Sequence, residues 1–154
     1  MVDPDTFLRM GREVLAKQPF SVLIGAQLCA LEPGRCELAL EVTERLKQQM
    51  GFAHGGVVSY LADNALTYAG GTAMQVPVVT SEYKINYVRP AIGRRLIARA
   101  RAVHFSKSQA VCQCEIVTVD DDGQEKLCAL AQGTIARLGG GAENSPPSNG
   151  TDPR

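Results

Sequence analysis

The stretch from His54 to Gly71 constrains the fold of this chain more than any other part of the sequence. Its apolar residues recur every three or four positions, which predicts a helix over 56–69 with one wide apolar face. Those residues are Val58, Leu61, Ala62, Ala65, Leu66 and Ala69. The helix would span roughly 20 Å, which is too short to cross a membrane. We expect Gly70 and Gly71 to end it, since glycine often follows the last helical turn.

Two features distinguish this stretch from an ordinary core helix. Asp63 places an acid inside the apolar run, where its side chain competes for backbone hydrogen bonds. Gly55 and Gly56 leave the backbone at the helix start open to another molecule. A helix N-terminus carries unpaired N–H donors and partial positive charge, so it can hold an anion or a developing oxyanion. The alternatives are a structural acid at 63, a tight helix–sheet crossing at 55–56 and a capping role for His54.

The residues before this helix predict one further helix and two strands. Asp3 and Pro4 form an N-cap followed by proline, which predicts a helix over 4–17. Residues 20–32 and 35–43 are predicted to be strands, joined by a Pro-Gly turn at 33–34. The segment 43–53 has no clean period and leads into the central helix.

After Gly71 the chain alternates apolar and polar residues, as strands do. Strands are predicted at about 79–87, 96–104, 109–116 and 124–138. The dipeptide Asp122-Gly123 predicts a hairpin turn before the last of them. By this alternation His104 falls on the apolar side of its strand and is predicted to be structural. Short turns between strands favour an antiparallel sheet, so the fold class is α+β, with the central helix covering one sheet face.

Composition limits the domain organisation and the partners. The 154 residues suffice for one domain, predicted over 1–138, and residues 139–154 are a Gly-, Pro- and Ser-rich stretch predicted to be a flexible tail. Sixteen basic residues balance sixteen acidic ones, which argues against a nucleic-acid partner. We see no signal peptide and no membrane span, so no membrane partner is expected.

The five cysteines indicate a reducing compartment. They are Cys29, Cys36, Cys112, Cys114 and Cys128, an odd number with no CxxC motif and no nearby histidine. We therefore predict buried, reduced thiols, no metal site and a cytoplasmic location.

The sequence HGGVVSYLAD resembles the signature of hotdog-fold acyl-CoA thioesterases of the phenylacetate-degradation type. In that family an HGG triplet is followed, nine positions after the histidine, by an acid on the central helix; here that acid is Asp63. The run TSEYKINYVRPA at 80–91 is similar to the family's third strand, and the resemblance covers roughly residues 7 to 138. It implies the hotdog fold, an antiparallel sheet wrapped around one long helix.

The chain departs from the family at two places. The family often has Asn six residues before the histidine, where this chain has Gln48. The family frequently has glycine followed by arginine between the fourth and fifth strands, where this chain reads Ser106-Lys107-Ser108.

The resemblance implies thioester hydrolysis and a role for each site residue. Asp63 is the general base for water, or the nucleophile. Gly56 donates its N–H to the thioester oxygen, with Gly55 nearby and His54 orienting that region. Gln48 and Thr80 complete the expected catalytic set. Three further residues are expected to bind the substrate: Ser81, Arg89 and Lys107.

Because Asp63 and Gly56 of one chain lie roughly 10 Å apart along the helix, the resemblance implies a site shared between two subunits. We expect a homodimer through paired sheets, doubled into a homotetramer. No cofactor is implied, since coenzyme A is part of the acyl-CoA substrate.

Two other functions stay open at this point. A hotdog hydratase or dehydratase would act on the same acyl thioesters, although such enzymes arrange their histidine and acid differently. A non-catalytic acyl-CoA-binding module would not need Asp63. The sequence does not choose between an aryl and a fatty acyl group, because apolar pockets discriminate by shape.

Overall fold

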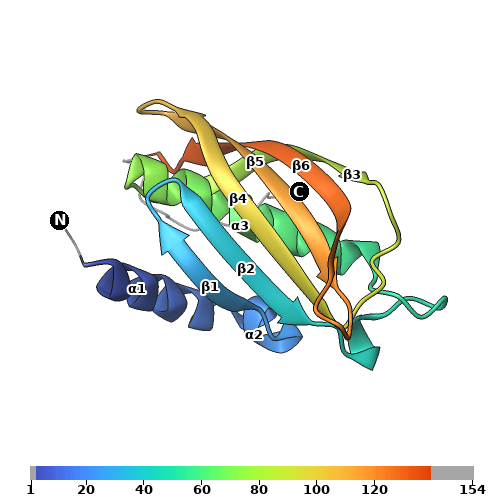
Figure 1. Ribbon diagram of the computed structural model, residues 1–154. Coiled ribbons are helices and arrows are strands. Elements are labelled where there is room, and N and C mark those ends of the chain that lie inside the picture. The colour runs from blue at the N-terminus through green and yellow to red at the C-terminus, as the bar shows by residue number, and fades with distance from the viewer. Residues whose placement is uncertain (1–2, 140–154) are drawn as a thin grey trace, which may run out of the picture.

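The computed structural model describes residues 3–139, which form one antiparallel sheet wrapped around one long helix (Figure 1). The helices are α1 (Pro4–Ala16), α2 (Pro19–Ile24), the 3-10 turn η1 (Glu44–Leu46) and α3 (Gly55–Met74). The strands are β1 (Gln27–Glu32), β2 (Arg35–Glu41), β3 (Val78–Tyr87), β4 (Arg95–Phe105), β5 (Gln109–Val119) and β6 (Glu125–Arg137). This is the predicted α+β hotdog architecture.

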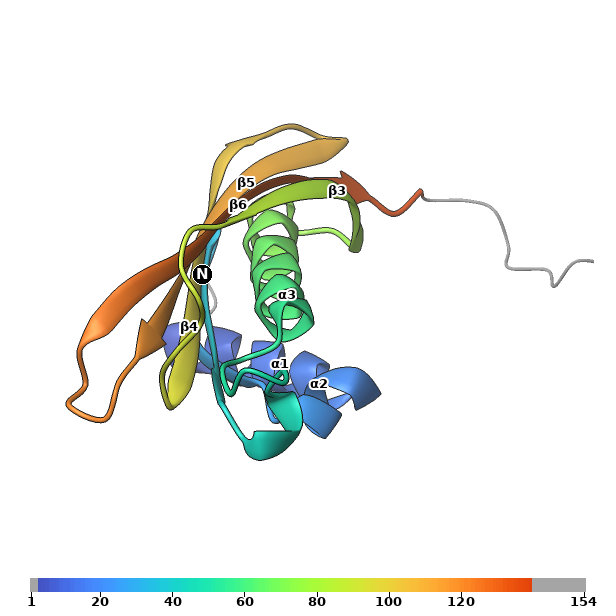
Figure 2. The same cartoon turned by 90° about the vertical axis from the view of Figure 1, so that its right-hand side faces the viewer.

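The six strands lie in the order β1-β2-β4-β5-β6-β3, and every neighbouring pair is antiparallel. Hairpins join β1 to β2, β4 to β5 and β5 to β6. The chain leaves the sheet after β2, forms α3, and returns as β3 on the far edge beside β6. Figure 2 shows the sheet curving around α3, with α1 and α2 beyond the opposite end of the sheet from β3.

The core lies between the sheet and the buried face of α3. From the helix it receives the predicted apolar residues, all buried: Val58, Leu61, Ala62, Ala65, Leu66 and Ala69. From the sheet it receives alternate residues of β2, β4, β5 and β6, among them Leu38, Leu96, Ile116 and Ile135. Burying side chains of this size contributes about 1.5–3 kcal/mol each. Because the apolar face of α3 packs on the sheet, the opposite side of the helix is the side that a substrate can reach.

The predicted end of α3 was wrong, because the helix continues past Gly70 and Gly71 to Met74. The chain instead leaves the helix at Gln75, which adopts the left-handed conformation with φ of 55°. Gly70 is buried against β6, and a Cβ there would lie 2.7 Å from Cβ of Ile135. These glycines therefore allow close helix–sheet packing and do not terminate the helix.

Replacing Gly70 by Ala is expected to destabilise the fold by about 2 kcal/mol, because the added methyl overpacks the Ile135 contact. At an open helical position the same change would be favourable by about 1 kcal/mol. The neighbouring change Gly71→Ala is the control, since its Cβ would meet a single atom within 4 Å, Cγ2 of Val78 at 3.0 Å. Thermal unfolding of both variants tests this; equal midpoints would contradict it.

The predicted strand over 20–32 was also wrong in its first half, which forms α2. Pro19 occupies the first helical position and Gly25 ends the helix in the left-handed conformation, with φ of 76°. Ser21 faces inward and is buried, whereas Phe20, Val22 and Leu23 are exposed. The strand β1 begins only at Gln27.

Two of the four register shifts in the sheet bear on predicted site or core residues. One lies between Ala102 and His104, and it places His104 in an exposed position and not on the apolar face. The prediction of a structural, core-facing His104 was therefore wrong. The other lies between Thr80 and Glu82. It places Thr80 on the same side of β3 as Tyr83, which faces α3.

The cysteines carry free thiols, and four are buried while Cys29 is half-buried. Burial raises the pKa of the Cys112 and Cys128 thiols to about 11 and that of Cys114 to about 12. These thiols are therefore protonated near neutral pH. No group of cysteine, histidine and acidic side chains within 3–139 is arranged to hold a metal ion.

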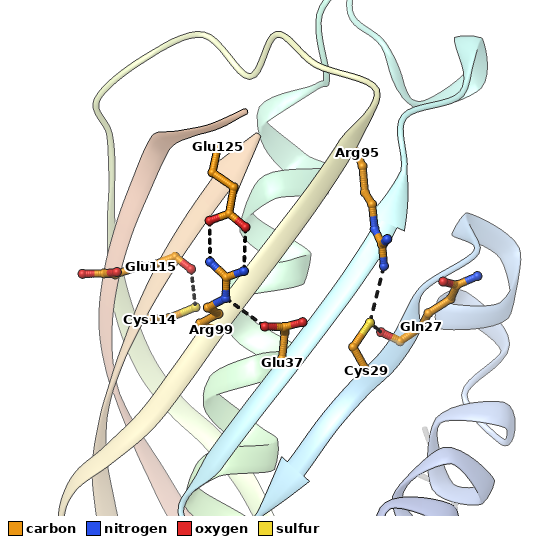
Figure 3. A network of polar contacts seen from close by, with 8 residues as sticks. All are labelled: Gln27, Cys29, Glu37, Arg95, Arg99, Cys114, Glu115 and Glu125. Atoms are coloured by element: carbon orange, nitrogen blue, oxygen red, sulfur yellow. Dashed lines mark hydrogen bonds and ion pairs between the residues drawn. The ribbon is translucent and has the colours of Figure 1, made fainter. Parts of the chain in front are cut away.

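The sheet face away from α3 carries an ion-pair network (Figure 3). Arg99 donates two hydrogen bonds to the Glu125 carboxylate, both at 2.7 Å, and one to Glu37 at 2.8 Å. The guanidinium lowers the pKa of the Glu125 carboxyl. The network joins β2, β4 and the start of β6, and its three residues are not among the predicted site residues.

The predicted tail, apart from Gly139, lies outside the described residues. Among residues 3–139, no helix is both long enough and apolar enough to span a bilayer.

Candidate functional site

Asp63 lies on the open side of α3, between β3 and α2, and is half-buried. Its Oδ1 accepts a hydrogen bond of 2.7 Å from the hydroxyl of Thr80. Its Oδ2 has no hydrogen-bond partner within 3–139, and no lysine or arginine of that range forms an ion pair with it. One carboxylate oxygen is thus fixed, and the other is available to water or to a substrate.

Thr67 is part of this arrangement, although the sequence analysis did not single it out. It lies one helical turn after Asp63, and its hydroxyl is 2.9 Å from the Asp63 carbonyl oxygen and 2.9 Å from the Thr80 hydroxyl. Thr67 donates its proton to the Asp63 carbonyl and Thr80 donates its proton to the Asp63 carboxylate, so the two hydroxyls lie side by side against Asp63. The sequence did contain a signal for Thr67: it lies four positions after Asp63, so the two residues share one face of the predicted helix.

Polar side chains flank Asp63 on both sides of α3. Towards β3, Ser59 and Tyr83 join through their hydroxyls at 2.5 Å. Towards α2, four side chains form a closed ring of hydrogen bonds: Gln18, Ser21, Tyr60 and Asn64. The ring holds α2 against α3 one residue from Asp63. These polar side chains of α3 form a strip that lies between β3 and α2, with Asp63 in its middle.

The start of α3 is capped by His54. The Gly56 N–H donates to His54 Nδ1 at 2.9 Å, and the Val57 N–H donates to the His54 carbonyl at 2.9 Å. With Nδ1 acting as acceptor, the neutral ring carries its proton on Nε2. Gly55 is the first helical residue, and its N–H has no hydrogen-bond partner within 3–139. The free donor at the helix start is therefore that of Gly55, while the Gly56 N–H is held by the imidazole.

A cavity of about 470 Å³ opens at this helix start. Its wall contains Gly55 and Gly56, together with Tyr87, Arg89 and Cys128. The Tyr87 hydroxyl donates to the Gly55 carbonyl at 3.1 Å, which fixes the first turn of α3 against β3. Because burial raises the pKa of the Cys128 thiol to about 11, that thiol is neutral and is a poor nucleophile.

The predicted substrate-binding residues do not gather at one place within the chain. Arg89 lies at the helix-start cavity, and its guanidinium donates to the Leu127 carbonyl at 3.0 Å, near the first residues of β6. Lys107 lies in the β4–β5 turn, where the Arg137 N–H donates to Ser108 at the last residue of β6. The two cations are thus separated by roughly 30 Å, the length of ten strand residues. Ser81 is exposed at the β3 bulge.

Gln48 lies in the loop that precedes α3. Its side-chain oxygen accepts from the Met50 N–H, and its backbone carbonyl accepts from Gly51 at 3.0 Å. The side chain therefore stabilises its own loop, and no hydrogen bond within 3–139 joins it to His54, Gly56 or Asp63.

The strand β3 forms one edge of the sheet, and within residues 3–139 only β6 pairs with it. Its outer edge therefore leaves a row of backbone donors and acceptors without strand partners. The polar strip of α3, which includes Asp63, lies next to this edge because Thr80 and Tyr83 of β3 contact it.

Comparison with known proteins agrees with this geometry. Residues 50–124 match the model of the thioesterase superfamily. The chain is 30% identical over 115 residues to a 1,4-dihydroxy-2-naphthoyl-CoA hydrolase of Listeria monocytogenes, covering 73% of this chain and 90% of that protein. It is 30% identical over 118 residues to the acyl-coenzyme A thioesterase PaaI of Escherichia coli, covering 76% of this chain and 81% of that protein.

Solved structures show the same fold. A thioesterase family protein from Silicibacter pomeroyi superposes with a TM-score of 0.80 at 34% identity, covering 86% of this chain and 99% of that one. The E. coli PaaI protein from the phenylacetic acid degradation operon superposes with a TM-score of 0.77 at 25% identity, covering 89% and 96%. The chain belongs to the thioesterase superfamily and is a hotdog-fold hydrolase of thioesters related to PaaI.

Proposed function

We propose that the protein hydrolyses the thioester of an aryl- or fatty acyl-CoA to the free acid and coenzyme A. The observation that carries this proposal is the Asp63 carboxylate, with one oxygen held by Thr80 and the other free, on an open face of α3. The acyl-CoA substrate is supported by the relatives, since two of them are named for acyl-CoA hydrolysis.

In the general-base route, Asp63 Oδ2 takes a proton from a water molecule as the water oxygen attacks the thioester carbon. Negative charge develops on the carbonyl oxygen, and the helix-start donors stabilise it. Collapse of the tetrahedral intermediate breaks the carbon–sulfur bond, and the proton held by Asp63 passes to the thiolate. In the nucleophilic route, Asp63 attacks the carbon itself, the carbon–sulfur bond breaks, and coenzyme A leaves as a thiolate that takes a proton from water. Water then hydrolyses the resulting anhydride, which releases the acid and regenerates the Asp63 carboxylate.

A site shared between two subunits fits both routes better than a site within one chain. Asp63 lies two turns along α3 from Gly55 and Gly56, which corresponds to roughly 10 Å along the axis. Pairing of two β3 edges would place the open face of one α3 against that of another, so that Asp63 of one subunit approaches the helix start of its partner. A homodimer is therefore proposed, with doubling to a homotetramer as the expected assembly.

A cytoplasmic location is also proposed. The cysteines of the described chain carry free thiols, as is usual in a reducing compartment.

The test of the proposed function is release of free thiol from acyl-CoA thioesters, followed with a thiol reagent. The panel should contain benzoyl-, phenylacetyl-, hexanoyl- and palmitoyl-CoA, with the acid product identified by mass. Thiol release with at least one of them is expected. Water addition to an enoyl-CoA without thiol release would support a hydratase, and binding without turnover would support a non-catalytic module; either result overturns the proposal.

Removing the Thr80 hydroxyl is expected to lower the turnover number about tenfold in Thr80→Val, since a hydrogen bond to a charged group contributes about 1.5–3 kcal/mol. Thr80→Ser keeps the donor and should retain most activity. The matched control is Thr134→Val, which removes a hydroxyl that donates to a carboxylate, Glu82, at 2.6 Å on the other sheet face. Equal turnover in Thr80→Val and Thr134→Val would show that the Asp63 contact has no catalytic role.

A further inference from the structure

A second cavity, of about 620 Å³, adjoins the helix-start cavity and shares Arg89 and Pro90 with it. One wall comes from the β5–β6 hairpin, including Asp120 and Lys126. The other wall comes from the loop before α3 and the segment 89–94. The two cavities are therefore neighbours, with Arg89 and Pro90 lying between the start of α3 and this cleft.

The cleft is rich in positive charge. Its cations are Lys47, Arg89, Arg94 and Lys126, against the acids Asp120 and Asp121, and Lys47 forms an ion pair with Glu44 beside the cleft. Such an excess favours an anion with more than one negative charge.

The two arginines are fixed in place by backbone groups and not by acids. Arg94 Nε donates to the Asp120 carbonyl at 3.2 Å, and Arg89 Nη1 donates to the Leu127 carbonyl at 3.0 Å. Neither guanidinium forms an ion pair within 3–139, whereas Arg95 and Arg99 on the outer sheet face both do. Arg89 and Arg94 therefore keep N–H donors for a ligand, at the fork geometry that suits phosphate.

Asp120, the acid that lies beside Lys126 in the cleft, is largely occupied by its own loop. Asp120 Oδ1 accepts from the N–H groups of Asp122 and Gln124 at 3.1 and 2.8 Å. Its Oδ2 lies 3.8 Å from Lys126 Nζ, a distance at which the attraction is weak because Lys126 is exposed. The Asp120 carboxylate therefore shapes the hairpin and cancels only part of the charge of the cleft.

We propose that this cleft binds the phosphorylated nucleotide of coenzyme A, with Arg89 and Arg94 on the diphosphate and Lys126 towards the remaining phosphate. This inference rests on the proposed function, because it assumes an acyl-CoA substrate whose thioester lies at the helix start. The pantetheine arm would then pass through the helix-start cavity. Lys107, roughly 30 Å away along β6, does not belong to the nucleotide site of the same chain.

The test uses the variant Arg94→Gln/Lys126→Gln, since neither residue touches the helix start or Asp63. Calorimetric titration with coenzyme A, 3′,5′-ADP and pantetheine separates the nucleotide from the arm. We expect coenzyme A and 3′,5′-ADP to bind at least about tenfold more weakly, the scale of one charge-assisted hydrogen bond, and pantetheine to bind unchanged. The charge-matched control is Arg9→Gln/Lys17→Gln on and next to α1, since neither residue lines the helix-start cavity or the cleft.

A second test compares the hydrolysis of an acyl-CoA with that of the matching acyl-pantetheine, which lacks the nucleotide. The variant should raise the Michaelis constant for phenylacetyl-CoA or for whichever acyl-CoA the panel selects, and leave hydrolysis of the matching acyl-pantetheine unchanged. Equal affinities of variant and wild type for 3′,5′-ADP would overturn the inference while leaving thioester hydrolysis intact. If the wild type hydrolysed no thioester but the variant still bound coenzyme A more weakly, the proposed function would be overturned and the nucleotide site would stand.

Discussion

Asp63→Asn is expected to lower the turnover number by at least about 10²-fold, the usual scale of a general base. The substitution keeps the size of the side chain and lets its carbonyl oxygen still accept from Thr80. It removes the negative charge and the basicity that both proposed routes need. The Michaelis constant should change far less, because contacts to the acyl group and to coenzyme A remain.

The same preparation decides whether Asp63 is catalytic or structural. A structural role predicts that activity per folded molecule stays while the thermal midpoint falls. A catalytic role predicts that turnover falls while the thermal midpoint stays. The midpoint should stay because no lysine or arginine within 3–139 pairs with Asp63, so the substitution leaves no buried cation without its partner. Glu13→Gln, an exposed acid-to-amide change on α1, controls for loss of one charge. Near-full turnover in Asp63→Asn would remove Asp63 from the mechanism.

Local pattern was sufficient for most elements of the fold. The strands β2 to β6 and the central helix were predicted because their periodic burial follows directly from alternation or helical spacing. The segment 19–24 was mistaken for a strand because its apolar run has no period, and its buried Ser21 contacts Tyr60, 39 positions later. A contact between residues 39 positions apart depends on the tertiary structure, and a short stretch of sequence does not reveal it.

The site shows the same division between local and tertiary information. Strict alternation along 79–87 would put Thr80 with Glu82, Lys84 and Asn86, facing away from α3. The bulge between Thr80 and Glu82 reverses this, and Thr80 reaches Asp63. The role of Thr80 came from the family resemblance, and only the register of β3 against β6 gives its physical reason.

Arg89 and Arg94 illustrate the limit for charged residues. In the sequence they are two of many surface cations, and the resemblance pointed to Arg89 and Lys107 together. Placement of Arg89 against Leu127 and of Arg94 against Asp120 depends on how the 89–94 segment meets the β5–β6 hairpin. Which cations gather in one cleft is therefore decided by chain packing and not by spacing.

Removing the free donor at the helix start by Gly55→Pro is expected to lower the turnover number about 10²-fold, the usual cost of one oxyanion-hole donor. Proline fits here, because Gly55 is the first helical residue and its N–H bonds to nothing within 3–139. His54 already has the extended conformation that precedes proline, with φ of −62° and ψ of 138°. Gly55→Ala keeps the N–H, and its Cβ would lie 3.7 Å from the Tyr87 ring, an ordinary contact. The alanine variant should therefore retain most activity.

The Gly55→Pro and Asp63→Asn variants together test whether the site is shared between subunits. In a mixed dimer, one of the two sites combines an intact Asp63 from one subunit with an intact helix start from the other. Co-expression of the two inactive chains should therefore restore about a quarter of wild-type turnover, because half of randomly formed dimers are mixed and each holds one good site. Light scattering on the same sample should give at least a dimer. Full activity in a monomer, or no recovery in verified mixed dimers, would place Asp63 and the helix start in the same chain's site and end the shared-site argument.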